Sequence, residues 1–155
     1  MAIDPRLELR KSMAAVPVIL RTLRDRFEDA ALTRRPSPGE WAALEVIAHL
    51  ADGEDWALRR VKRMLAEEEP ELEPFDQAAL SVDRRYLELD ADAELARFER
   101  LRAEHLAVLD GLDDAGWARA GIHGEHGRMT VELYESHVAA EEVDHLAQLS
   151  RLLPS

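Results

Sequence analysis

The stretch PGEWAALEVIAHLADGEDWALRRVKRMLAEE, residues 38–68, decides the fold of this 155-residue chain. Its apolar residues recur at steps of three and four, which places them on one face of an α-helix. Ser37 and Glu40 form a Ser-x-x-Glu capping box around Pro38, a pattern typical of a helix start. We therefore predict a helix from about Pro38 to Glu68 with an apolar arc of Leu44, Ile47, Leu50, Ala51, Leu58, Val61 and Leu65.

Three further segments carry helical signals of the same kind. Asp4-Pro5 marks the start of one helix, Asp90 or Asp92 caps another, and Thr130 caps a last helix that extends to about Leu153. The connections 69–91 and 113–129 are long; we predict a short helix over about 77–86 in the first and no strands in either. Four long helices with long crossings predict an all-α four-helix bundle, in a single domain over residues 1–155.

The composition excludes several classes of function. The chain has no cysteine, which excludes a disulfide framework, a zinc–thiolate site and a catalytic thiol. Asp and Glu outnumber Lys and Arg by 32 to 20, so a formal charge of −12 opposes binding to nucleic acid and to anionic lipid. No segment approaches the roughly 20 apolar residues that a membrane helix needs. We expect a soluble, cytoplasmic protein.

Polar residues on apolar helix faces are the candidates for a site. His145 projects into the apolar arc of the last helix, with Glu141 one turn earlier at its margin and His137 at the polar edge. Glu54 projects near the centre of the second helix's arc, whereas His49 falls outside it. A buried group of this kind needs a partner, either a metal or a hydrogen bond. The plainer alternative is that Glu141 and His145 form an ordinary helix-stabilising pair.

Three segments resemble one known family. The segment RPSPGEWAALEVIAHLADGE, residues 35–54, resembles the Trp-x-x-x-Glu-x-x-x-His-Leu signature of the DinB-like, or YfiT-like, superfamily. HVAAEEVDHLAQL, residues 137–149, is similar to its last-helix motif, in which two histidines four residues apart precede Leu-x-Gln. The loop with Gly121, His123, Gly127 and Thr130 resembles the segment before that helix.

The resemblance implies a divalent metal held by one residue of the second helix and two of the fourth. Carried over by position, the ligands are His49, Glu141 and His145, with His137 as an alternative or extra ligand. Glu141 stands where the family usually has histidine, and a His₂Glu set still suits Zn, Ni, Fe or Mn. Glu45 or Glu54 would orient His49, and His123 would line the pocket.

The resemblance also implies several functions, which the residues leave open. The favoured one is metal-dependent transfer of a low-molecular-weight thiol, such as bacillithiol or mycothiol, to an electrophilic small molecule in detoxification or stress response. The thiol would come from the cosubstrate, since the chain has none. The alternatives are a metal-dependent hydrolase that activates water and a metal-free binding or stress-response protein whose site has decayed at Glu141. A homodimer is a further expectation.

Overall fold

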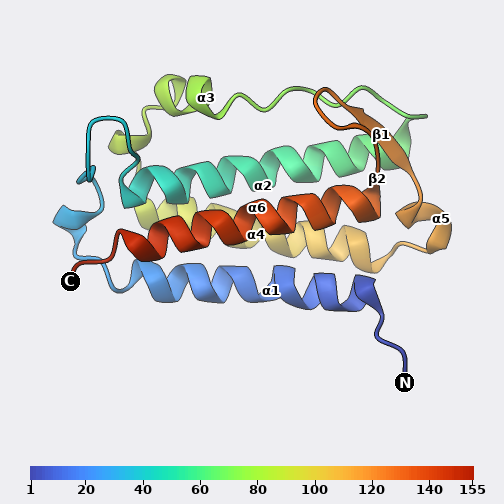
Figure 1. The fold of residues 1–155 in the computed structure, drawn as a ribbon, viewed down its shortest axis with the longest axis horizontal. Coiled ribbons are helices and arrows are strands. Elements are labelled where there is room, and N and C mark those ends of the chain that lie inside the picture. Colours follow the sequence, from blue (N-terminus) through green and yellow to red (C-terminus); the bar gives the residue numbers. More distant parts are fainter.

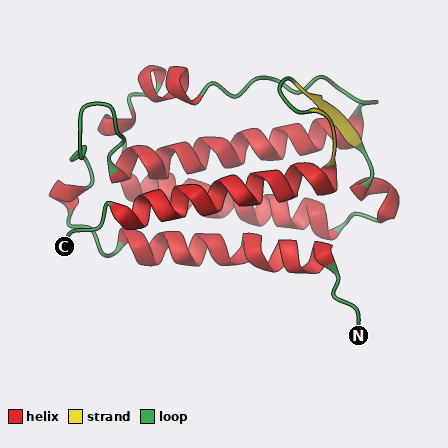
Figure 2. Cartoon of the chain, in the orientation of Figure 1, coloured by secondary structure: helices red, strands yellow, loops and turns green.

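The computed structural model describes residues 1–155 and is built on four long helices that lie side by side (Figures 1 and 2). They are α1 (Pro5–Arg24), α2 (Ala43–Ala66), α4 (Ala91–Asp110) and α6 (Val131–Arg151). Helices α1 and α2 each pack against both α4 and α6. The four-helix bundle predicted from the sequence is therefore confirmed. None of the helices has the length and hydropathy of a membrane span.

Capping residues begin three of these helices as expected. The Asp4 carboxylate accepts the Arg6 N–H, and Asp90, the first of the two predicted alternatives, accepts the Ala93 N–H. The Thr130 hydroxyl accepts the N–H of Leu133. Each side chain satisfies a backbone donor that the first helical turn leaves free.

Helix α2 begins later than predicted. Ser37–Glu40 forms a turn, and the helix starts at Ala43. Glu45, not Glu40, supplies the returning carboxylate, because its Oε1 accepts the Ala42 N–H at 3.0 Å. The buried Glu45 carboxylate is also fixed by the guanidinium of Arg35 at 2.8 and 2.7 Å.

The two long connections contain more structure than predicted. The first holds α3 (Gln77–Asp83) and the 3₁₀ turn η2 (Tyr86–Glu88); a second such turn, η1 (Asp29–Ala31), follows α1. The connection before α6 holds α5 (Asp114–Trp117) and an antiparallel hairpin of β1 (Ala120–His123) and β2 (Gly127–Thr130), so the expectation of no strands was wrong. The hairpin also hydrogen-bonds to residues 70–72. It therefore joins the chain before α3 to the start of α6 (Figure 1).

The bundle core has two apolar parts separated by charged side chains. One part contains Leu20, Ile47 and Leu95, and the other contains Val61, Leu109 and Val131. Between them along the helices lie five buried polar residues: Glu54, Arg102, His105, Glu135 and Glu142. Glu54 and Glu142 of this charged layer also line a cavity.

Candidate functional site

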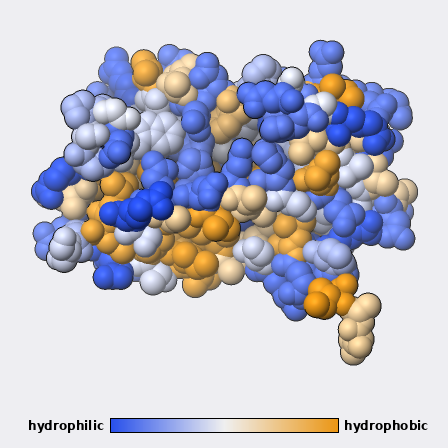
Figure 3. Space-filling model, in the orientation of Figure 1, coloured by the Kyte–Doolittle hydropathy of each residue, from blue (hydrophilic) through white to orange (hydrophobic).

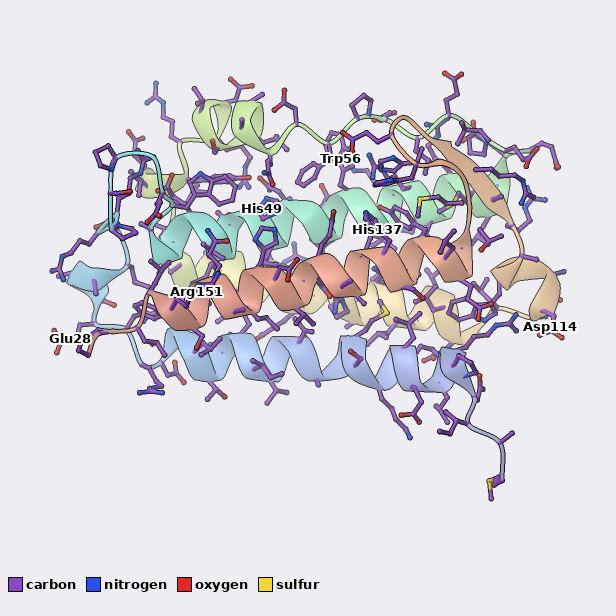
Figure 4. The ribbon with its side chains drawn as sticks, viewed as in Figure 1. Glu28, His49, Trp56, Asp114, His137 and Arg151 are labelled. Atoms are coloured by element: carbon purple, nitrogen blue, oxygen red, sulfur yellow. The ribbon has the colours of Figure 1, made fainter.

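Two histidines meet between α2 and α6. His49 Nε2 lies 3.0 Å from His145 Nε2, although the residues are 96 positions apart in the sequence. His49 is buried, and its ring packs against Trp41 at 5.0 Å and stacks on Phe75 at 5.6 Å between ring centroids. Figure 4 shows His49 on the side of α2 that faces α6. The bundle therefore brings together two of the three predicted metal ligands.

The hydrogen bonds around this pair indicate its tautomers. The Gln148 amide oxygen lies 3.0 Å from His145 Nδ1 and can only accept, so His145 carries its proton on Nδ1. His145 Nε2 then accepts from His49 Nε2–H. His49 Nδ1 is buried without a partner. Burial, together with the neighbouring His145, lowers the pKa of His49 to about 3, so this ring is neutral at physiological pH.

The third predicted ligand does not face the pair. Glu141 is exposed, and its Oε1 lies 3.2 Å from Nε2 of His137 one turn earlier. No three His, Asp or Glu side chains are close enough together to hold a metal ion. The paired imidazoles fit a metal as two neutral nitrogen donors, while Glu141 has a different partner in this conformation.

The two residues expected to orient His49 lie elsewhere. Glu45 binds Arg35 and the backbone at the start of α2. Glu54 binds Arg102 at 3.0 and 2.7 Å, and its Oε1 also lies 2.6 Å from His105 Nδ1. The prediction that either carboxylate orients His49 was wrong, because Arg35 binds Glu45 and Arg102 binds Glu54.

Sequence reasoning missed the centre of the charged layer. Arg102 is 1% exposed and binds Glu54, Glu142 and the Met13 carbonyl. His105 is fully buried between Glu54 and Glu135, at 2.6 Å from each. Burial lowers the pKa of His105, but its hydrogen bonds to Glu135 and Glu54 more than offset this and raise the pKa to about 10. His105 therefore stays protonated and acts as a second buried cation.

Glu142 is a further carboxylate that the sequence did not single out. Burial raises its pKa to about 7, against the opposing effect of Arg102. Its neighbour Glu54 has a pKa lowered to about 2, because the hydrogen bonds and charges of His105 and Arg102 outweigh burial. The layer thus combines two cations with three carboxylates inside the bundle.

A cavity of about 730 Å³ opens beside the histidine pair. His49 and His145 line it together with the aromatic side chains of Trp56 and Phe75. Glu141 and His137 line it as well, and so does His123, the predicted pocket residue. Seen in Figure 4, His137 lies farther along α6 than the pair, toward the hairpin. The cavity therefore extends along the groove between α2 and α6.

Comparison with known proteins gives the family. Residues 13–149 match the model of the DinB superfamily. The Bacillus subtilis protein YfiT, suggested to be a metal-dependent hydrolase, is 29% identical over 141 residues, covering 88% of this chain and 79% of YfiT. A Geobacillus kaustophilus protein with the same suggested activity is 26% identical over 149 residues, covering 94% of this chain and 84% of the relative.

The solved structures agree with this result. YfiT, described as a four-helix bundle of unusual topology, superposes with a TM-score of 0.82 at 27% identity and covers 97% of this chain and 89% of its own. The mycothiol-dependent maleylpyruvate isomerase shares the fold, with a TM-score of 0.76 at 14% identity over 94% of this chain and 61% of its own. The matched residues span nearly the whole bundle, and this chain belongs to the DinB superfamily.

Proposed function

We propose that this chain is a divalent-metal-dependent hydrolase of a small-molecule substrate, with the metal held by His49, His145 and Glu141. One observation carries the proposal: two imidazole nitrogens from different helices lie 3.0 Å apart at the wall of a cavity. The relatives that cover most of the chain support it, since they are suggested to be metal-dependent hydrolases.

The donor chemistry of the pair suits a metal. Two histidine nitrogens at ~2.1 Å from a tetrahedral ion lie about 3.4 Å from each other, so the observed separation of 3.0 Å needs little change. His145 already presents an unprotonated Nε2, because its Nδ1 donates to Gln148. His49 would carry its proton on Nδ1. Glu141 is one turn before His145 on the same face of α6. Its exposed carboxylate would separate from His137 and become the third ligand of a His₂Glu set.

The cavity walls indicate where the nucleophile comes from. None of the side chains that line the cavity is Ser, Thr, Cys or Lys. A divalent metal at this position supplies Lewis acidity and lowers the pKa of a coordinated water. The ring of Phe75 covers His49, and with Trp56 it gives the cavity an apolar wall. In the proposed hydrolase, that coordinated water would be the nucleophile.

Thiol transfer is the second candidate. The absence of cysteine is compatible with it, because the thiol would then come from a cosubstrate. A cavity of about 730 Å³ has room for both a thiol and an electrophilic small molecule. In this case the chain would act in detoxification or stress response, and turnover would require added thiol.

The experiment measures hydrolysis of 4-nitrophenyl acetate by the chain freed of metal and then loaded with Zn²⁺, Ni²⁺, Mn²⁺ or Fe²⁺, with and without a small thiol. We expect metal-dependent turnover without thiol, lost in His49→Ala and His145→Ala and retained in the control His126→Gln, which alters an exposed histidine of the same cavity. Turnover that required thiol would favour transfer. Turnover that was independent of metal, or unchanged in His145→Ala, would refute both candidates.

We also propose that the chain forms a homodimer through an apolar face. Apolar side chains gather over α6 and the adjoining side of α1 (Figure 3). Val18 of α1 and Val143 of α6 are 68% and 58% exposed. Light scattering after size exclusion tests this: the wild type should have twice the mass of a chain in which both valines are replaced by glutamate. A monomeric wild type would contradict it.

A further inference from the structure

Arg60 is an unusual cation for so acidic a chain. Of the arginines that are at least partly buried, it alone has no carboxylate within 4 Å. Its Nε and Nη2 donate to the Glu73 carbonyl, and its Nη1 lies 3.4 Å from the Tyr134 hydroxyl. These contacts use three of its five N–H groups, so two remain free. A positioned guanidinium with free donors at a cavity wall points to an anionic ligand.

His123 offers a second donor at the same end of the cavity. The N–H groups of Glu125 and His126 both point at its Nδ1, at 3.1 and 3.3 Å. Nδ1 must therefore be the acceptor, which leaves the proton of the neutral ring on Nε2. Burial and the nearby Arg60 lower the pKa of His123, consistent with a neutral ring. The turn of the hairpin thus fixes this histidine as a hydrogen-bond donor.

The carboxylates near this end leave Arg60 unpaired. Glu141 pairs with His137, and Glu125 is exposed on the hairpin turn. Neither forms an ion pair with the guanidinium. The aromatic rings of Trp56 and Phe75, 5.5 Å apart, lie in the same cavity. A ligand here would meet two polar donors and an apolar wall.

This end of the cavity is distant from the histidine pair. Arg60 follows His49 by 11 residues, three turns of α2, so the two lie on the same helix face about 16 Å apart along the axis. The hairpin that carries His123 covers the same end of the bundle as the C-terminal part of α2 (Figure 1). A single elongated molecule could contact both ends.

We propose that Arg60 and His123 bind the anionic group of the substrate, a carboxylate or phosphate, while the apolar wall holds the part that extends toward the histidine pair. The substrate class is then an elongated small molecule with an anionic end and a reactive centre remote from it. This inference rests on the proposed function only in taking this cavity as the substrate site. Arg60 and His123 then determine substrate specificity.

The test measures ligand binding to the metal-free chain by NMR titration. The probes are 4-phenylbutyrate, its neutral isostere 4-phenylbutyramide and 3-phenylpropylphosphonate, which share a phenyl ring for the apolar wall. We expect an anionic probe to bind at least about tenfold more tightly than the amide, as a hydrogen bond to a charged group allows. The tighter of the two anions distinguishes a carboxylate site from a phosphate site.

Variants assign the preference to Arg60. Arg60→Gln should reduce the preference for the anion to about twofold or less, and Arg60→Lys should keep part of it because the charge remains. The matched control Arg63→Gln removes a charge one turn away that pairs with Glu67 outside the cavity, and should keep the preference. Circular dichroism verifies that each variant is folded.

Three results would overturn the inference: equal binding of amide and anions, no binding of any probe, or a preference that survives in Arg60→Gln. Because the measurement needs neither metal nor turnover, its outcome is separate from that of the hydrolase assay. A chain that prefers anions but does not hydrolyse esters would refute the proposed function alone.

Discussion

Replacing Arg102 by methionine should destabilise the chain more than almost any other single change. The side chain is 1% exposed and forms hydrogen bonds with two carboxylates and a backbone carbonyl. Methionine fills much of the space but leaves Glu54 and Glu142 buried without their shared cation. Removing one partner of a buried ion pair typically costs about 3–5 kcal/mol, because the remaining charge is uncompensated.

That loss is large for a protein of this size. Native proteins are stable by about 5–15 kcal/mol, so Arg102→Met should remove roughly a fifth or more of the free energy of unfolding. The corresponding fall in Tm is about 6–20 °C. Urea unfolding followed by circular dichroism at 222 nm measures the difference, with the m-value as a test that the transition remains two-state.

Two further variants make the test specific. Arg100→Met removes an exposed arginine of the same helix and should change stability by less than about 0.5 kcal/mol. The double variant Glu54→Gln/Arg102→Met should lose less than the sum of the single variants, because Glu54→Gln removes one of the two carboxylate charges that Arg102 compensates. If Arg102→Met were within 1 kcal/mol of wild type, or the two changes were additive, the charged layer would not have the role described.

Two other predictions concern pH and packing. The pKa of His105 is raised to about 10 between Glu54 and Glu135, whereas histidine in the unfolded chain has a pKa near 6.5. Protonated His105 therefore stabilises the folded state fully below pH 6.5, and this stabilisation is lost as the pH rises toward 10. The difference in unfolding free energy between wild type and His105→Gln should therefore fall by up to about 1.4 kcal/mol per pH unit in that window. Urea unfolding at about pH 6 and about pH 9.5 measures this difference. A difference that stayed constant would contradict the prediction. Gly121→Ala should destabilise by about 1–3 kcal/mol, because the added Cβ would lie 2.8 Å from Leu72 Cδ2. Thermal unfolding measures this, and an unchanged Tm would show that the hairpin can shift away from that contact.

The bundle could be predicted because its signals are local. Apolar steps of three and four mark each long helix, and Asp4, Asp90 and Thr130 cap three of them. The hairpin could not be predicted in this way. Its strands have four residues each, too few for an alternating pattern, and they are held by contacts with residues 70–72 that are 50 positions away. The start of α2 was misplaced because two glutamates, Glu40 and Glu45, could each complete a cap, and only the fold shows which one does.

The candidate site was only partly visible in the sequence. A straight helical projection put His49 outside the apolar arc, yet the residue is buried, because the segment that carries Phe75 covers the side of α2 that the projection assigned to solvent. The family resemblance, not periodicity, indicated this residue. Arg102 was missed since its partner Glu54 is 48 residues away. The central position of Glu54 in an apolar arc was the one signal that a buried cation had to exist.

Equilibrium dialysis with elemental mass spectrometry would show directly whether His49, His145 and Glu141 hold a divalent metal. We expect wild type to bind one divalent ion per chain. His49→Ala and His145→Ala should each weaken the affinity by more than about 100-fold, since loss of an outer partner of a ligand alone costs 10–100-fold. Glu141→Ala should weaken it less, and His126→Gln should leave it unchanged. A chain that binds no ion, or binds it equally after both His49 and His145 are replaced, would show that the histidine pair is not a metal site.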